Sequence, residues 1–112
     1  MTNPTVKRLE PDLTTKGQLA EQLKASREHI EKKTILDRLN RAEVSLAAAR
    51  ELPDEISGEP AKISDCQRRL EVKLWRRPTY IFEFHQGLIY YIEHYDIRVP
   101  DELLDVLTLP LV

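Results

Sequence analysis

Apolar residues in the first half of the chain recur at the spacing of a helix. One set follows at steps of four, three, four and three residues: Ile35, Leu39, Ala42, Leu46 and Ala49. An earlier set shares a face that is rotated from the first: Leu19, Leu23 and Ile30. Such spacing predicts amphipathic helix, and no Gly or Pro lies between Lys24 and Leu52. We therefore expect one long helix opened by a Thr15–Gln18 capping box, or a helix pair that breaks near Thr34.

The second half is predicted to hold three shorter helices. The first covers about residues 64–77, where Cys66, Leu70 and Leu74 follow at steps of four. The last covers about residues 101–108, where two acidic residues follow a proline, as is typical of a helix start.

The stretch YIFEFHQGLIYYIEHYD, residues 80–96, holds most of the aromatic side chains and allows two interpretations. As a helix, it gathers large apolar side chains on one side: Ile81, Phe84, Leu88, Tyr91, Ile92 and Tyr95. As a β-hairpin, it forms two strands around a turn in which Gly87 is left-handed. We favour a helix at about 79–96, because Pro78 suits its first turn and a loop and a new helix follow it.

These elements predict an all-α fold, in which the long N-terminal helix or helix pair packs on a C-terminal group of three shorter helices. The alternative is an α+β fold with a hairpin at about 79–96. Residues 1–13 hold two prolines and no periodicity, so we expect a mobile arm there. Residues 14–112 then form a single helical domain with an internal linker at about 53–62, which contains Pro53, Gly58 and Pro60.

The composition is that of one folded domain with little overall charge. The chain has 112 residues and a formal net charge of −2, so no overall basic field attracts nucleic acid or a membrane surface. No apolar run approaches a membrane span, and the N-terminal residues lack the apolar core of a signal peptide. A single cysteine, Cys66, excludes an internal disulfide framework. We therefore expect a cytoplasmic protein without membrane contact.

Candidate catalytic and metal-binding residues are sparse. His29, His85 and His94 are too scattered for the ligand spacing of a standard metal site. Cys66 stands in the first turn of a predicted helix, where a thiol can become reactive, but no base or oxyanion hole can be identified beside it. Three glycines can scarcely build a phosphate-binding loop. We expect a non-enzymatic protein without metal or cofactor, and a thiol enzyme around Cys66 ranks last.

A basic stripe is the first candidate binding surface. Residues 62–77 carry an excess of positive charge, and Arg69, Lys73 and Arg76 recur at steps of four and three on the predicted helix. This stripe suits an acidic protein surface or a phosphate backbone. The acidic residues 78–112 of the same chain are at least as good a partner for it.

A second candidate surface lies at about residues 16–31, in the stretch GQLAEQLKASREHI. Its small and apolar residues follow a regular pattern: Leu19, Ala20, Leu23, Ala25, Ser26 and Ile30. This pattern resembles the helix-turn-helix of bacterial repressors and partition proteins, although Lys24 stands where that family usually has glycine. The resemblance implies a DNA-binding regulator in which Ser26, Arg27 and His29 lie toward the major groove. Two glutamates of the stretch lower the positive charge that phosphate binding requires.

Our main hypothesis is a non-enzymatic protein–protein interaction module, a small helical adaptor or inhibitor that binds another protein. A DNA-binding transcriptional or partition regulator is the alternative. The N-terminal helix has two apolar faces, and a domain of this size need cover only one of them. The other face would be free for a homodimer, in which we expect self-association through Ile35, Leu39 and Leu46.

Overall fold

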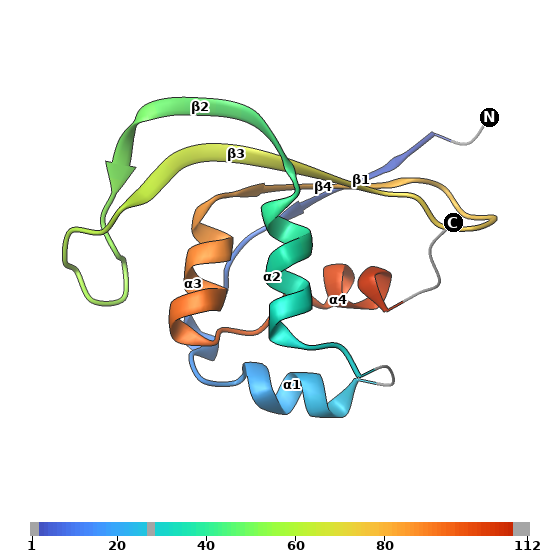
Figure 1. Ribbon diagram of the computed structural model, residues 1–112, viewed down its shortest axis with the longest axis horizontal. Coiled ribbons are helices and arrows are strands. Elements are labelled where there is room, and N and C mark those ends of the chain that lie inside the picture. The colour runs from blue at the N-terminus through green and yellow to red at the C-terminus, as the bar shows by residue number, and fades with distance from the viewer. Residues whose placement is uncertain (1–2, 27–28, 109–112) are drawn as a thin grey trace.

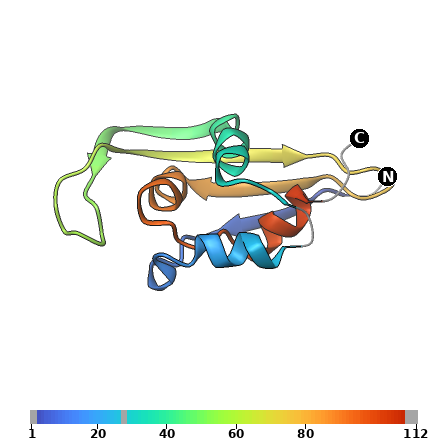
Figure 2. The ribbon, with the colours of Figure 1, turned by 60° about the horizontal axis from the view of Figure 1, so that its bottom comes forward.

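A four-stranded sheet forms one layer of the molecule, and helices form a second layer on one of its faces (Figure 1, Figure 2). The computed structural model describes residues 3–26 and 29–108. The strands are β1 (Thr5–Leu9), β2 (Glu43–Leu52), β3 (Ile63–Val72) and β4 (Tyr80–His85). The helices are α1 (Leu19–Ala25), α2 (Lys32–Asn40), α3 (Gly87–Tyr95) and α4 (Asp101–Leu107), and a 3-10 turn covers Leu13–Thr15.

The strand order in the sheet is β1-β4-β3-β2. Strand β3 lies antiparallel to both β2 and β4, whereas β1 lies parallel to β4. The first two strands of the sequence therefore form the two opposite edges of the sheet. The far end of the β2–β3 hairpin curves and extends beyond the helices (Figure 1).

The all-α prediction is wrong, because residues 43–52 and 63–72 form strands. The step of four between Cys66 and Leu70 is also twice the repeat of a strand, so both residues lie on one side of β3, and both are buried. In β2 the apolar residues from Val44 to Ala49 are exposed, and Leu52 at the end of the strand packs against the core only in part. Their helical spacing therefore carried no information on burial. The α+β alternative is closer to the structure.

The predicted helix at 79–96 is half strand and half helix, since β4 ends at His85 and α3 begins at Gly87. Phe82 and Phe84 are two residues apart and both fully buried, as in a strand that faces a core. The hairpin of the alternative is also wrong, because its second arm is helix α3. Both interpretations failed by assigning a single period to a segment that changes period in its middle.

The N-terminal segment takes part in the sheet. Residues 5–9, within the segment that we expected to be a mobile arm, form β1 and pair with β4. Leu9 at the end of β1 is buried in the core. The predicted linker at 53–62 is the loop between β2 and β3.

The core lies between the sheet and the helices. Its fully buried side chains include residues of all four helices and of β4: Leu19, Ile35, Leu39, Phe82, Phe84, Leu88, Ile92 and Leu103. Gln22 of α1 adds a buried polar contact, because its Nε2 donates to Val99 O at 2.7 Å and its Oε1 accepts from Val99 N at 2.8 Å. This pairing satisfies a buried amide and holds α1 against the segment before α4.

Candidate functional site

Strand β2 forms one edge of the sheet and is exposed along nearly its whole length. The side chains of Val44 and Leu46 are 49% and 69% exposed. Residues 44–49 read VSLAAA and contain neither a charged residue nor a proline. Natural edge strands commonly carry charged residues or proline, because an unprotected edge pairs with other strands. The centre of the β2 edge is therefore without charge, while Glu43, Arg50 and Glu51 lie toward its two ends.

The pairing of β2 with β3 contains two irregularities. The register shifts between Val44 and Leu46, which leaves Ser45 as an extra residue on β2. The Ser45 hydroxyl donates to the backbone oxygen of Gln67 at 3.3 Å. A second shift lies at residues 47–51. Such bulges bend and twist a strand, in agreement with the curved hairpin of Figure 1.

Arg68 of β3 anchors the beginning of β2. Its guanidinium donates to the backbone oxygens of Asn40 and Ala42, at 2.8 and 2.9 Å, and to Gln86 Oε1 at 2.8 Å. Its Nε is buried and has no hydrogen-bond partner among the described residues. Asn40 ends α2 and Ala42 directly precedes β2. Arg68 therefore fixes the direction in which the edge strand leaves the helix.

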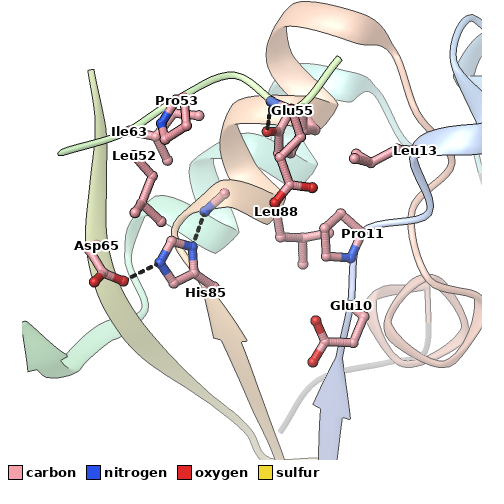
Figure 3. A pocket seen from close by; sticks show the side chains of 12 residues that line it. Glu10, Pro11, Leu13, Leu52, Pro53, Glu55, Ile63, Asp65, His85 and Leu88 are labelled. Atoms are coloured by element: carbon pink, nitrogen blue, oxygen red, sulfur yellow. Dashed lines mark hydrogen bonds and ion pairs between the residues drawn. The ribbon is translucent and has the colours of Figure 1, made fainter. Parts of the chain in front are cut away.

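A cavity of about 380 Å³ adjoins the other end of β2 (Figure 3). Apolar side chains form much of its wall: Leu13, Leu52, Ile63 and Leu88. The polar groups at its wall are mostly acidic: Glu10, Glu55, Asp65 and His85. Its volume lies within the range of small-molecule sites.

His85 and Asp65 form a polar corner of this cavity (Figure 3). His85 Nδ1 accepts a hydrogen bond from the backbone N–H of Gly87 at 2.9 Å, so this nitrogen carries no proton. His85 Nε2 lies 2.9 Å from Asp65 Oδ1 and donates a hydrogen bond to that carboxylate. Both nitrogens of the ring are therefore occupied by hydrogen bonds. In this arrangement it positions Asp65 and the start of α3 rather than offering a free base.

Arg50 joins β2 to this corner, because its Nε donates to Asp65 Oδ2 at 2.5 Å. The hydrogen bonds from Arg50 and then from His85 hold the pKa of Asp65 below its ordinary value of 3.8, although burial opposes them. Asp65 is therefore anionic at neutral pH, and its ion pair fastens the second half of β2 to β3.

Asp54 is buried in the loop that joins β2 to β3. Its Oδ1 accepts from the backbone N–H groups of Ile56 and Ser57, at 2.8 and 3.0 Å. Its Oδ2 accepts from the hydroxyls of Tyr90 and Tyr95, at 2.8 and 2.5 Å. Burial raises the pKa of Asp54, but the hydrogen bonds together outweigh it and lower the pKa to about 2. The bond to Asp54 also raises the pKa of Tyr90 to about 12. The loop is thus fastened to α3 by a buried carboxylate.

The predicted basic stripe does not lie on a helix. Arg69 is on β3, opposite an acidic residue of each neighbouring strand. Lys73 follows the end of β3, and Arg76 lies in the turn toward β4, where its guanidinium is 4.2 Å from the ring centre of Trp75. The three basic residues therefore lie on a strand and in the turn after it, and the helix face on which we predicted them does not exist.

Leu46 is the exposed member of the set that we predicted for self-association. Ile35 and Leu39 of α2 are 0% exposed, since they pack in the core of their own chain. A contact between two copies cannot use them without unfolding α2. Leu46 lies near the middle of β2, with its side chain in solvent.

The residues that the helix-turn-helix resemblance implied for DNA contact lie at the end of α1 and beyond. Ser26 caps the C-terminus of α1 with an extended backbone, and its hydroxyl donates to Leu23 O at 3.0 Å. His29 is exposed and precedes α2, while Arg27 lies outside the described residues. Residues 29–31 are not helical, and the next helix, α2, begins at Lys32.

Cys66 is buried on β3, and its Sγ lies 3.6 Å from Gln86 Oε1. It does not stand at a helix start, where we expected it. Within residues 3–26 and 29–108, no group of three or more His, Cys, Asp or Glu side chains is placed to hold a metal ion. In the same part of the chain, no helix combines the length and the apolar character that crossing a membrane requires.

Sequence reasoning missed two groups that only the fold brings together. Asp54 meets Tyr90 and Tyr95 across 36 and 41 residues of chain. Asp65 meets His85 across 20 residues. No local pattern marks such pairs. The edge strand did carry a signal, namely six consecutive residues without charge or proline, but its alanines favour helix.

No protein-family model, curated protein or solved structure matches this chain. The geometry of the chain is therefore the basis for a functional proposal. It offers an open strand edge to a partner, and a cavity whose His85 and Asp65 are already bound to each other.

Proposed function

We propose that this protein is a non-enzymatic protein–protein interaction module, an adaptor or inhibitor whose partner chain binds along the outer edge of β2. The observation that carries this proposal is the exposed, uncharged stretch at residues 44–49, at the end of the sheet. A partner segment in extended conformation would add to the sheet as a further strand. Backbone hydrogen bonds would supply affinity, and side chains would supply specificity.

The apolar side chains of this edge favour a partner that covers both faces of the sheet. Val44 lies opposite Arg68, and Leu46 lies opposite Gln67. Because consecutive residues of β3 point to opposite faces, Val44 and Leu46 do so as well. Burying both on association would remove apolar surface from water.

The β2 edge is held at both ends, so the strand loses less conformational entropy when a partner binds. Arg68 fixes the beginning of β2, and the Arg50–Asp65 ion pair fixes its second half. The free thiol of Cys66 suits a reducing compartment, and we place the action of the protein in the cytoplasm.

Site-specific photo-cross-linking tests this proposal. A photoreactive residue at position 48 of the full chain, mixed with lysate of the source cells, should capture a defined protein. The same residue at position 83, on the inner strand β4, should not. Leu46→Lys should abolish capture, because charge on an edge opposes strand addition, whereas Glu71→Lys on the inner strand β3 should not. Equal capture at positions 48 and 83, or capture that survives Leu46→Lys, would contradict the proposal.

A further inference from the structure

We propose that the partner of β2 is a second copy of this chain, and that the two β2 strands pair antiparallel about a two-fold axis at Ala47. This inference rests on the proposed function of the strand edge and names its occupant. The pairing would join both sheets into one continuous sheet and would close the association at two copies.

The bulge in β2 places Glu43 and Leu46 on the same face of the sheet. Glu43 lies opposite Arg69, and Leu46 lies opposite Gln67. These two residues of β3 are two positions apart, so they point to the same face. Glu43 and Leu46 therefore share a face although they are three positions apart, because Ser45 is an extra residue between them.

The second half of β2 contains the second register shift, in which residues 48–50 lie opposite the single residue Asp65, while Ala47 and Glu51 on either side of the shift lie on one face. Arg50 donates to Asp65, which shares a face of β3 with Gln67. Arg50 therefore lies on the face of Leu46, which precedes it by four positions, and Ala48 lies between them on this face. The residues on either side of Ala48 point to the other face, which the helices cover.

A two-fold axis at Ala47 matches the faces of the facing residues. Ser45 remains an extra residue, as at the first register shift with β3, whereas Ala48, Ala49 and Arg50 would each face one residue of the second copy. The pairs formed with the second copy each lie on one face: Leu46 with Ala48, Val44 with Ala49, and Glu43 with Arg50. The bulge, which would disturb pairing with a regular strand, is what brings the charged pair onto a common face.

Charge complementarity selects this register. The Glu43–Arg50 pair occurs twice by symmetry, and opposite charges that face each other across strands stabilise the pairing. Arg50 is already held on this face by its ion pair within the chain. Moving the axis by one residue to Ala48 would instead place Leu46 opposite Arg50 and Glu43 opposite Leu52. That register would lose both charge pairs and set an apolar side chain against a guanidinium.

Residue size also suits the axis. Alanine at positions 47, 48 and 49 leaves space on both faces of the sheet for the larger side chains of the facing strand. Val44 and Leu46, which are 49% and 69% exposed in one copy, would each be covered by an alanine and the neighbouring backbone of the other. Apolar cover at the centre with paired charges at both ends is the usual arrangement of a specific interface.

A charge exchange tests the register. Light scattering after gel filtration should give about twice the chain mass of 13.1 kDa for the wild-type protein at high micromolar concentration. Glu43→Arg and Arg50→Glu should each raise the dimer dissociation constant by about tenfold or more, since each turns two attractions into repulsions. The double variant should recover wild-type dimerisation. Glu71→Arg, on the inner strand β3, is the matched control and should leave the dimer dissociation constant unchanged.

The rescue cannot arise within one chain. Residues 43 and 50 are seven positions apart on one strand and cannot touch each other. Within the chain, Glu43→Arg sets a positive charge opposite Arg69, and Arg50→Glu sets a negative charge beside Asp65. The double variant keeps both of these unfavourable contacts with β3, so only the contact between copies can recover. Failure of the double variant to recover, with a wild-type circular dichroism spectrum, would overturn the register.

A cysteine at the axis gives an independent test. In a Cys66→Ser background, Ala47→Cys should form an intermolecular disulfide under mild oxidation, because facing residues at the axis lie within disulfide range. Ala49→Cys should cross-link with itself far less, since it faces Val44 of the other copy. Equal cross-linking at both positions would overturn the pairing.

A monomer mass at every concentration, together with capture of a different protein at position 48, would reject the second copy while the proposed function stands. A monomer that also captures nothing at position 48 would reject both. Dimerisation that Leu46→Lys and the single charge changes leave intact would show that the copies meet elsewhere, and it too would overturn the inference.

Discussion

The buried carboxylate of Asp54 is the residue on which the position of the β2–β3 loop depends. Two backbone N–H groups and two tyrosine hydroxyls donate to it, and no lysine or arginine side chain is among its hydrogen-bond partners in the described residues. Such a carboxylate is stable only while all of its donors remain in place. The same donors make its folded pKa, about 2, lower than the ordinary value of 3.8.

This difference predicts an acid-sensitive stability. The unfolded chain takes up a proton on Asp54 near pH 4, whereas the folded chain does so near pH 2, so stability is lost as the pH falls between these values. Asp54→Asn should lower the melting temperature by about 5–10 °C at pH 7. The difference in melting temperature between the variant and the wild-type protein should become smaller from pH 4 to pH 2. Melting curves by circular dichroism over this range measure it, with Asp105→Asn on the exposed side of α4 as control. A difference in melting temperature that does not change with pH would contradict the lowered pKa of Asp54.

At the scale of the elements, two adjacent arginines of β3 have opposite roles. Arg68 points to the helices and satisfies the backbone oxygens between α2 and β2, while Arg69 points to the open face. Arg68→Met should lower the unfolding free energy by about 2–4 kcal/mol, because three charge-assisted hydrogen bonds are lost and the partly buried carbonyl of Ala42 remains unpaired. Arg69→Met should cost less than about 1 kcal/mol. Urea denaturation of both variants measures the difference, and equal losses would refute the anchoring role of Arg68.

The alternation along β3 also explains how much of these elements the sequence could predict. The helix predicted at 101–108 lies where α4 is found. The spacing of Cys66 and Leu70 correctly placed them on one face, but steps of four fit a helix and a strand equally well. Strand β2 could not be recognised by burial, since nearly all of its side chains are exposed. Its identity depends on hydrogen bonds to β3, a contact that local pattern does not encode.

The candidate site was predictable only in part, for a similar reason. Leu46 was selected as a surface for self-association and is exposed, but it was selected together with two residues of the core. A helical period placed all three on one face, whereas the chain changes from α2 to β2 between Leu39 and Leu46. Asp54 acquires its tyrosine partners through the packing of the β2–β3 loop on α3, and Asp65 meets His85 through the pairing of β3 with β4. No sequence motif predicts either contact.

At the scale of the whole molecule, the sheet has two edges of different character. Strand β1 has five residues and carries Lys7 and Arg8, which protect an edge, whereas β2 has ten residues with an uncharged centre. If the second copy pairs with β2 alone, association should protect one edge of the sheet and leave the other as it is. This asymmetry distinguishes strand pairing from unspecific association, which would affect both edges or neither.

Amide hydrogen exchange at two protein concentrations measures this asymmetry. Exchange in residues 44–50 should slow as the concentration rises from low to high micromolar, because outward N–H groups become paired across the axis. Exchange in residues 5–9 should not depend on concentration. In Glu43→Arg, the concentration dependence of residues 44–50 should shift to higher concentration, and adding Arg50→Glu should restore it. Equal protection of both edges, or protection of β1 alone, would place the contact elsewhere and leave β2 without a role in self-association.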